Sequence, residues 1–257
     1  MAIIAELPRE LYSGNNPFDS AANKYIDTGY RHSFVMPEFI EAVLATIQPA
    51  FWLEIGSMVG GSAVKTAQAA DKLSIATEIV CLDPFCADVA AWAEETRPVN
   101  QWRCLKLENG RPTIYERFLA NVSASGYSER ILPIPVTSAV GIKLLQRLFD
   151  ERRISGLPSV IFLDSAHEQG ETLLEISSAW SILPKGGILI GDDWNWEAVS
   201  HDVISFARTV PQNPEHVHRF AAALPQGSVI SVEKGVMTYK GRPNNSLRPW
   251  PQWLLFK

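Results

Sequence analysis

Apolar residues recur along the chain in two alternating patterns. Runs that are apolar at nearly every position predict strands buried on both faces, and they occupy residues 51–55, 78–83, 131–136, 159–164 and 187–192. Apolar residues three and four apart predict the helices around them, at residues 37–47, 62–72, 86–95, 113–124, 139–150, 170–182 and 198–208. This order predicts an α/β fold, with a doubly wound, mainly parallel sheet covered by helices on both faces.

Some stretches do not follow the alternation. Residues 1–35 are polar and broken by SGNNP, which predicts an irregular N-terminal lead-in before a single domain at 36–257. The polar segment 96–112 and the proline-containing segment 210–226 are expected to form lids. The late segments GSVISVEKGVMTY and WLLFK predict antiparallel strands near the C-terminus.

The first apolar run continues into the glycine turn EIGSMVGGS. Glu54 interrupts the apolar run, Gly56 and Gly60 follow it, and a helix of small residues begins at Ser62. In open parallel sheets, ligands bind outside the carboxyl ends of the strands. Glycines there let a ligand approach the backbone, and the start of a helix offers N–H groups. Asp83 ends the next strand, where an acidic residue that binds ribose hydroxyls is expected. The two features together predict a cofactor site.

A second group of polar residues follows the later strands. Asp164 ends the fourth predicted strand, and Asp192 and Asp193 end the fifth, so three carboxylates are expected at one sheet edge. Their mutual repulsion requires a cation, and oxygen ligands suit Mg²⁺, Mn²⁺ or Ca²⁺. His167 is a candidate general base because its unperturbed pKa is near neutrality.

Simpler explanations exist for some of these residues. The Asp192–Asp193 pair could cap the following helix, which is the commoner reason for such a pair. His167 could be a solvated loop residue. Glu175, on the helix predicted at 170–182, is expected to face solvent.

The glycine turn and Asp83 resemble the first two motifs of the class I S-adenosylmethionine-dependent methyltransferases, over roughly residues 35–208. The resemblance implies a Rossmann-like fold and S-adenosylmethionine as the cofactor. A nicotinamide cofactor is the weaker alternative, because the glycine spacing does not match its motif. The cofactor-binding residues that the resemblance implies are Glu54, Gly56, Ser57, Gly60, Ser62, Asp83, Ser138 and Asp164.

The pattern D-x-x-H, then LPKGG, a strand and DDW, resembles one branch of that family. The branch includes macrocin-type and other antibiotic-sugar O-methyltransferases and cephalosporin-hydroxylase-like proteins. It implies that Asp164, Asp192 and Asp193 bind Mg²⁺ or Mn²⁺ and that His167 removes the proton of the acceptor. Ser165 stands where relatives often have glycine.

The resemblance therefore implies a metal-assisted O-methyltransferase that acts on a hydroxyl of a sugar or polyketide-type natural product. Two alternatives stay open. One is an inactive cofactor-binding protein that serves as a regulatory or scaffolding subunit, and the other is a hydroxylase. No iron site of two histidines and one carboxylate is visible in the sequence, which disfavours the hydroxylase.

Composition limits the remaining classes. The 257 residues are 46% apolar with a net charge of -5, which suits one large domain and gives no support to a nucleic-acid partner. No apolar run approaches the ~20 residues of a membrane helix, and the first residues do not resemble a signal peptide. Cys81, Cys86 and Cys104 are expected to be free thiols in a reducing compartment, which favours the cytoplasm. A homo-oligomer is left open.

Overall fold

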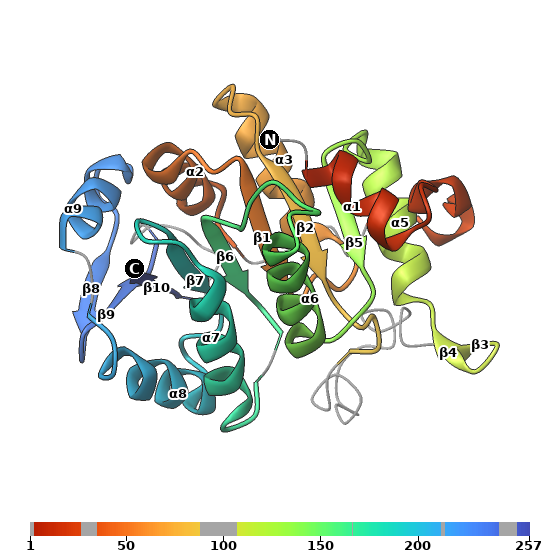
Figure 1. The fold of residues 1–257 in the computed structure, drawn as a ribbon. Coiled ribbons are helices and arrows are strands. Elements are labelled where there is room, and N and C mark those ends of the chain that lie inside the picture. The colour runs from red at the N-terminus through yellow and green to blue at the C-terminus, as the bar shows by residue number, and fades with distance from the viewer. Residues whose placement is uncertain (1–2, 27–34, 88–106, 166, 212–213, 242–250) are drawn as a thin grey trace.

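A computed structural model describes residues 3–26, 35–87, 107–165, 167–211, 214–241 and 251–257. Its centre is an eight-stranded sheet (Figure 1), which has five parallel strands followed by three strands that each run antiparallel to their neighbours. The order across the sheet is β5 (Ile131–Ile134), β2 (Glu78–Leu82), β1 (Phe51–Ile55), β6 (Val160–Leu163), β7 (Ile188–Gly191), β10 (Gln252–Phe256), β9 (Val236–Tyr239) and β8 (Ile230–Glu233).

Helices cover both faces of the sheet, and each face has its own apolar cluster. In β1, Leu53 belongs to one cluster and Trp52 to the other, because successive strand residues point to opposite faces. The Leu53 face is covered by α1 (Ile3–Leu11), α6 (Ser138–Asp150), α7 (Glu171–Ile182) and α8 (Glu197–Ala207). The Trp52 face is covered by α2 (Pro37–Ile47), α3 (Gly61–Lys72), α5 (Ile114–Ser125) and α9 (Pro214–Ala223). The predicted α/β fold is confirmed.

Three acidic residues of the predicted sites lie one residue beyond the strands. β2, β6 and β7 end just before Asp83, Asp164 and Asp192, respectively. These strands are therefore shorter at their carboxyl ends than the sequence predicts. The three carboxylates belong to the loops that follow the strands. Of the helix predicted at 86–95, residues 88–95 lie outside the described residues.

The predicted irregular lead-in is wrong for residues 3–11, which form α1. Ile3 and Leu7 are fully buried against the sheet, as their spacing of four residues in a helix allows. The Glu78 carboxylate accepts a hydrogen bond of 2.6 Å from the backbone N of Ile3, which satisfies one free N–H at the start of the helix. Two short 3₁₀ helices follow, at Pro17–Ser20 and Asn23–Tyr25.

Most of the segment 210–226, one of the two expected lids, forms the helix α9. Phe220 is fully buried, and its ring contacts Phe39 edge-to-face at a centroid distance of 5.8 Å. The prolines of this segment stand before the helix, at its first position and beyond its end, where proline is compatible with helix formation. The other expected lid contains a small hairpin of β3 (Leu107–Glu108) and β4 (Arg111–Pro112), and its residues 96–106 lie outside the described residues.

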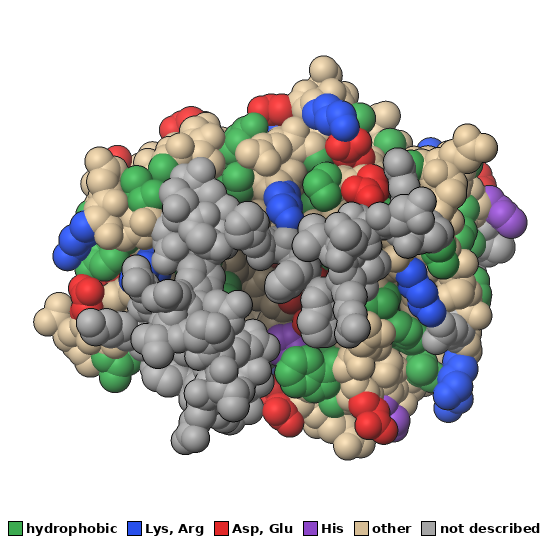
Figure 2. Space-filling view, turned by 180° about the vertical axis from the view of Figure 1, so that it is seen from behind, with side chains coloured by type: hydrophobic (Ala, Val, Ile, Leu, Met, Phe, Trp, Pro, Cys, Tyr) green, Lys and Arg blue, Asp and Glu red, His purple; other side chains and the backbone are tan. Residues whose placement is uncertain are grey.

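In the described part of the chain, no helix combines the length and apolar character needed to cross a membrane. On the face seen in Figure 2, described Lys and Arg side chains are scattered among acidic ones rather than gathered into a patch. Cys81 is buried and Cys86 is exposed, and Cys104 lies outside the described residues.

Candidate functional site

The loop after β1 and the end of β6 touch at Gly56. This residue has a φ of +83°, and a Cβ on it would lie 2.1 Å from the carbonyl oxygen of Asp164. Only glycine fits such a backbone conformation and such a close approach. In the adjacent ladder, the N of Asp164 donates to the carbonyl of Ile55 at 2.9 Å. The glycine loop is therefore fixed directly against the acidic end of β6.

Glu54 lies beneath the glycine loop and is fully buried. Its Oε1 accepts a hydrogen bond of 2.8 Å from the Ser62 hydroxyl in the first turn of α3. Burial raises the pKa of Glu54 to about 7, and the hydrogen bond from Ser62 opposes part of that shift. Glu54 therefore joins β1 to the start of α3.

Asp83 holds the same loop from the neighbouring strand. Its Oδ2 accepts hydrogen bonds from the backbone N of Ser57 at 2.8 Å and of Met58 at 2.7 Å, and its Oδ1 accepts one from the N of Phe85. Burial raises the pKa of the Asp83 carboxyl, and these backbone hydrogen bonds oppose the rise. Asp83 therefore shapes the glycine loop through these hydrogen bonds. Its contact with a ribose stays a prediction.

Gly60 closes the loop and precedes α3. It has a φ of +87° and no side-chain cap. Its N donates to the carbonyl of Ser57 at 2.7 Å, so the loop is a tight turn. The N–H groups at the start of α3 consequently have no side-chain acceptor at the cap position, which is the arrangement that binds anionic groups in other helices.

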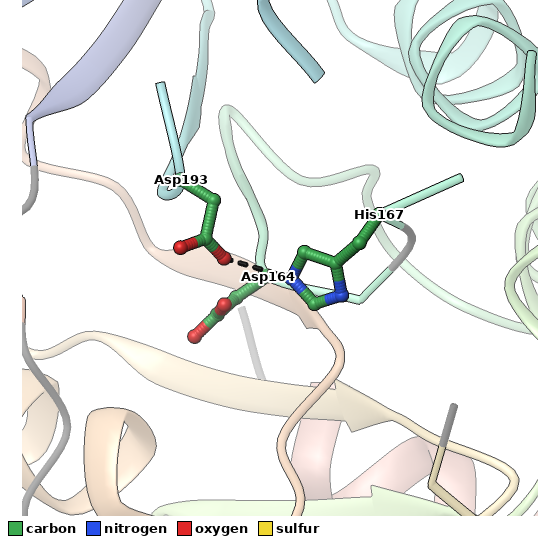
Figure 3. A group of neighbouring side chains, drawn as sticks. All are labelled: Asp164, His167 and Asp193. Carbon is green, nitrogen blue, oxygen red and sulfur yellow. Dashed lines mark hydrogen bonds and ion pairs between the residues drawn. The ribbon is translucent and has the colours of Figure 1, made fainter. Parts of the chain in front are cut away.

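A second group forms where β6 and β7 end. Figure 3 shows Asp164, His167 and Asp193 pointing toward one another from two loops. Each side chain is half-buried. One possible metal-ligating atom from each, a carboxylate oxygen or a ring nitrogen, lies within 4.8 Å of the other two. The shortest contact joins Nε2 of His167 to Oδ2 of Asp193 at 2.7 Å. Burial, together with the charges of Asp192 and Asp193, raises the pKa of Asp164 well above its usual range.

Asp192 lies beside this group rather than in it. Its side chain is only 6% exposed, and its Oδ1 accepts hydrogen bonds of 3.0 Å from Nε2 of Gln252 and from the N of Asp193. Burial and the charge of Asp193 raise the pKa of Asp192. The indole N–H of Trp253 donates to the backbone carbonyl of Asp192 at 3.0 Å, so β10 fixes this residue from two sides.

The capping alternative for the two aspartates is wrong. α8 begins after Trp196, and no side chain caps it. Asp193 instead adopts a φ of +57°, a conformation that is uncommon outside glycine. The indole ring of Trp196 lies 4.9 Å from the His167 ring and is 37% exposed, so it forms one side of the group.

The prediction that Glu175 faces solvent is wrong. Its Oε2 accepts a hydrogen bond of 2.6 Å from the Ser165 hydroxyl, directly after Asp164. Burial raises its pKa, and a hydrogen bond with Ser138 opposes the rise. Glu175 therefore links α7, the start of α6 and the loop after β6.

Asp202 is a further residue that sequence reasoning did not single out. It is 1% exposed on α8, and its Oδ2 accepts hydrogen bonds from the N of Gly170 at 2.7 Å and of Leu173 at 3.1 Å. It caps α7 from another helix and so fixes the end of the loop that carries His167. Neither Asp202 nor Gln252 belongs to a motif, so only the fold brings them here.

These residues surround a small cavity at the carboxyl edge of the sheet. It is lined by Leu163, Asp164, Ser165, His167, Thr172, Glu175, Asp192, Asp193, Val199 and Trp253.

Comparison with known proteins extends this picture. A family model described as a methyltransferase domain matches residues 53–194, more than half of the chain and a range that includes both groups of residues. A search of curated protein sequences finds no match. Among solved structures, cofactor-bound Rv0187 from MTB is 16% identical, with a TM-score of 0.50, 99% of this chain covered and 95% of that chain.

Two further structures are similar at lower scores. A protein assigned as an O-methyltransferase from Klebsiella pneumoniae is 14% identical with a TM-score of 0.49, covering 97% of this chain and 93% of its own. The calicheamicin methyltransferase CalS11 is 14% identical with a TM-score of 0.48, covering 84% and 76%. At such identities, the likeness concerns the fold.

Proposed function

Because the chain belongs to the methyltransferase-domain family and is an S-adenosylmethionine-dependent methyltransferase, we propose that it methylates a hydroxyl group of a small molecule with the help of a divalent metal ion. The observation that carries the proposal is the gathering of Asp164, His167 and Asp193 directly beside the glycine loop. We propose a sugar or a polyketide-type natural product as the acceptor, on the resemblance of the D-x-x-H and DDW motifs to the antibiotic-sugar branch.

The loop after β1 fits the cofactor. Gly56 and Gly60 keep side chains away from the backbone, and the uncapped start of α3 suits the carboxylate of the amino-acid part. Acidic side chains near the loop suit the positive charges on the ammonium and sulfonium groups of S-adenosylmethionine. The residues that would line the cofactor are Glu54, Gly56, Ser57, Gly60, Ser62, Asp83, Ser138 and Asp164.

The group at the ends of β6 and β7 fits a divalent ion. Asp164 and Asp193 would supply carboxylate oxygens, and His167 lies beside both of them. Asp192 adds a third carboxyl nearby, and burial together with the charges of Asp192 and Asp193 raises the pKa of Asp164, an unfavourable environment for its charge that a cation would relieve. When bound, a divalent ion stabilises negative charge that develops on an acceptor oxygen.

The reaction is a displacement at the methyl carbon. The acceptor oxygen forms a bond to this carbon, the carbon–sulfur bond breaks with its electron pair going to sulfur, and S-adenosylhomocysteine leaves. The hydroxyl proton must depart as the oxygen attacks, and the groups that the chain offers there are Asp164, His167 and Asp193. Holding both reactants on one rigid sheet edge removes much of the entropic cost of their encounter.

The test is methyl transfer from labelled S-adenosylmethionine to a panel of sugar nucleotides and phenolic polyketides, with and without EDTA. We expect transfer to a hydroxyl that stops on chelation and returns with Mg²⁺ or Mn²⁺, whereas calorimetry shows that cofactor binding survives chelation. Transfer that is indifferent to chelation would remove the metal from the proposal. Cofactor binding without any transfer across the panel would favour the inactive regulatory or scaffolding subunit.

A further inference from the structure

We propose that His167 is itself a ligand of the metal ion, so that the site consists of Asp164, His167 and Asp193 and takes a transition metal such as Mn²⁺ in preference to Mg²⁺. This inference rests on the proposed function, which calls for an ion at this sheet edge. It replaces the all-oxygen set expected from the sequence, in which His167 served as the base.

The distances favour this set of three. Ligands of one ion at about 2.1 Å lie roughly 3 Å apart when adjacent and at most about 4.2 Å apart when opposite. One ligand atom from each of Asp164, His167 and Asp193 lies within 4.8 Å of the other two, so modest side-chain shifts would bring them to these separations. The 2.7 Å contact of His167 Nε2 with Asp193 already resembles an adjacent pair.

Asp192 is not one of the three proposed ligands, because other hydrogen bonds fix its position. Its Oδ1 accepts hydrogen bonds from Gln252 and from the backbone of Asp193, and β10 also binds its carbonyl. Its Oδ2, in contrast, accepts no hydrogen bond from any described residue, in a side chain that is 94% buried and lines the same cavity. Such an oxygen is suited to receive a hydrogen bond from a water molecule on the ion.

The surroundings of His167 restrain its ring for coordination. The indole of Trp196 lies at 4.9 Å and at 32° to the imidazole plane. Asp202 fixes the far end of the loop through Gly170. Because the ring is held with Nε2 toward the two carboxylates, coordination needs no rotation of the side chain.

A nitrogen ligand changes which ion is preferred. Imidazole is a common ligand of Zn, Cu, Fe and Ni, whereas Mg²⁺ favours carboxylates, carbonyls and water. Mn²⁺ accepts both kinds of donor. The protein is therefore expected to hold Mn²⁺ against a large excess of Mg²⁺.

The experiment uses the full chain, stripped with a chelator and loaded with Mn²⁺, and reads the ion by pulsed electron paramagnetic resonance. We expect coupling to one directly bound ¹⁴N nucleus. His167→Gln should abolish this coupling and weaken Mn²⁺ binding by more than the roughly 10–100-fold loss that removal of an outer-sphere partner causes. His201→Gln is the matched control, because His201 is an exposed histidine that also lies beside an aspartate, Asp202, at 3.3 Å.

The outcomes separate the inference from the proposed function. Bound Mn²⁺ without nitrogen coupling in the unaltered chain would overturn the inference and return His167 to the role of base. Failure to bind Mn²⁺ would overturn it as well. Methyl transfer is measured on the same samples, so activity without nitrogen coupling defeats only the inference, and nitrogen coupling without activity defeats only the proposed function.

Discussion

The carboxylate of Asp83 accepts a hydrogen bond of 2.7 Å from the backbone N of Met58, two residues after the turn glycine Gly56. Met58 has a φ of +43°, so this bond holds a residue other than glycine in the left-handed region. An acid expected to contact a ribose thus also sets the shape of the loop that faces the cofactor. Its removal should affect the cofactor site in two ways.

Asp83→Ala is expected to weaken S-adenosylmethionine binding by about 1–3 kcal/mol, because backbone N–H groups of the loop lose their acceptor and the ribose loses a partner. Isothermal titration calorimetry measures the change. Asp71→Ala, which removes a half-exposed carboxylate paired with Arg130 at 2.7 Å, is the control and should bind normally. An unchanged affinity in folded Asp83→Ala protein would contradict the assignment.

Gly56→Ala is expected to destabilise the fold much more than Gly126→Ala. Both glycines have a φ near +80°, but a Cβ at Gly126 would meet nothing within 4 Å, whereas one at Gly56 would collide with the Asp164 backbone. The shared conformational cost is about 1–2 kcal/mol, and the collision should add about 1–3 kcal/mol at Gly56. Urea unfolding gives both values, and equal losses would show that the collision relaxes without cost.

Glu54→Gln is expected to flatten the dependence of stability on pH. The pKa of Glu54 rises from 4.5 to about 7 on folding, so between these values the folded chain holds a proton that the unfolded chain has lost. This contribution to stability is fully present below pH 4.5 and is lost as the pH rises through about 7. Urea unfolding across this range should show a smaller fall for the variant, which keeps an acceptor for Ser62. Glu129→Gln, at an exposed position, should keep the slope of the unaltered chain. Identical slopes in all three proteins would argue against a buried proton on Glu54.

Asp202→Ala is expected to lower the free energy of unfolding by about 1–3 kcal/mol, because two backbone N–H groups at the start of α7 lose a buried acceptor. Hydrogen exchange should quicken at the amides of Gly170 and Leu173. Asp19→Ala, at an exposed position, provides the comparison. Unaltered protection at both amides would show that α7 does not depend on this cap.

Much of the fold could be predicted because buried strands are continuous apolar runs. β1 at 51–55 and α2 at 37–47 have the predicted limits. β2, β6 and β7 end one residue earlier than predicted, because the chain turns into a loop at Asp83, Asp164 and Asp192, although the backbone N of each still donates to the neighbouring strand. α1 was not predicted because its position depends on packing against the sheet and on the carboxylate of Glu78, which is distant from α1 in the sequence. α9 escaped because its prolines flank the helix rather than break it.

The candidate site was less predictable than the fold. Asp192 and Asp193 are neighbours in the sequence, but neighbouring side chains at a strand end point in different directions. One of them consequently faces Gln252, and the other faces His167. Gln252 comes from β10, whose pairing with β7 no local pattern reveals. Which acids gather around a common point was therefore decided by long-range packing.

The contact between Gly56 and Asp164 has a thermodynamic consequence. It is made by backbone atoms, with no flexible side chain in between to absorb a displacement. A ligand that tightens the glycine loop must therefore shift the position of Asp164, and an ion that draws on Asp164 must shift the loop. The cofactor and the ion are expected to alter each other's affinity reciprocally, by the same factor in both directions.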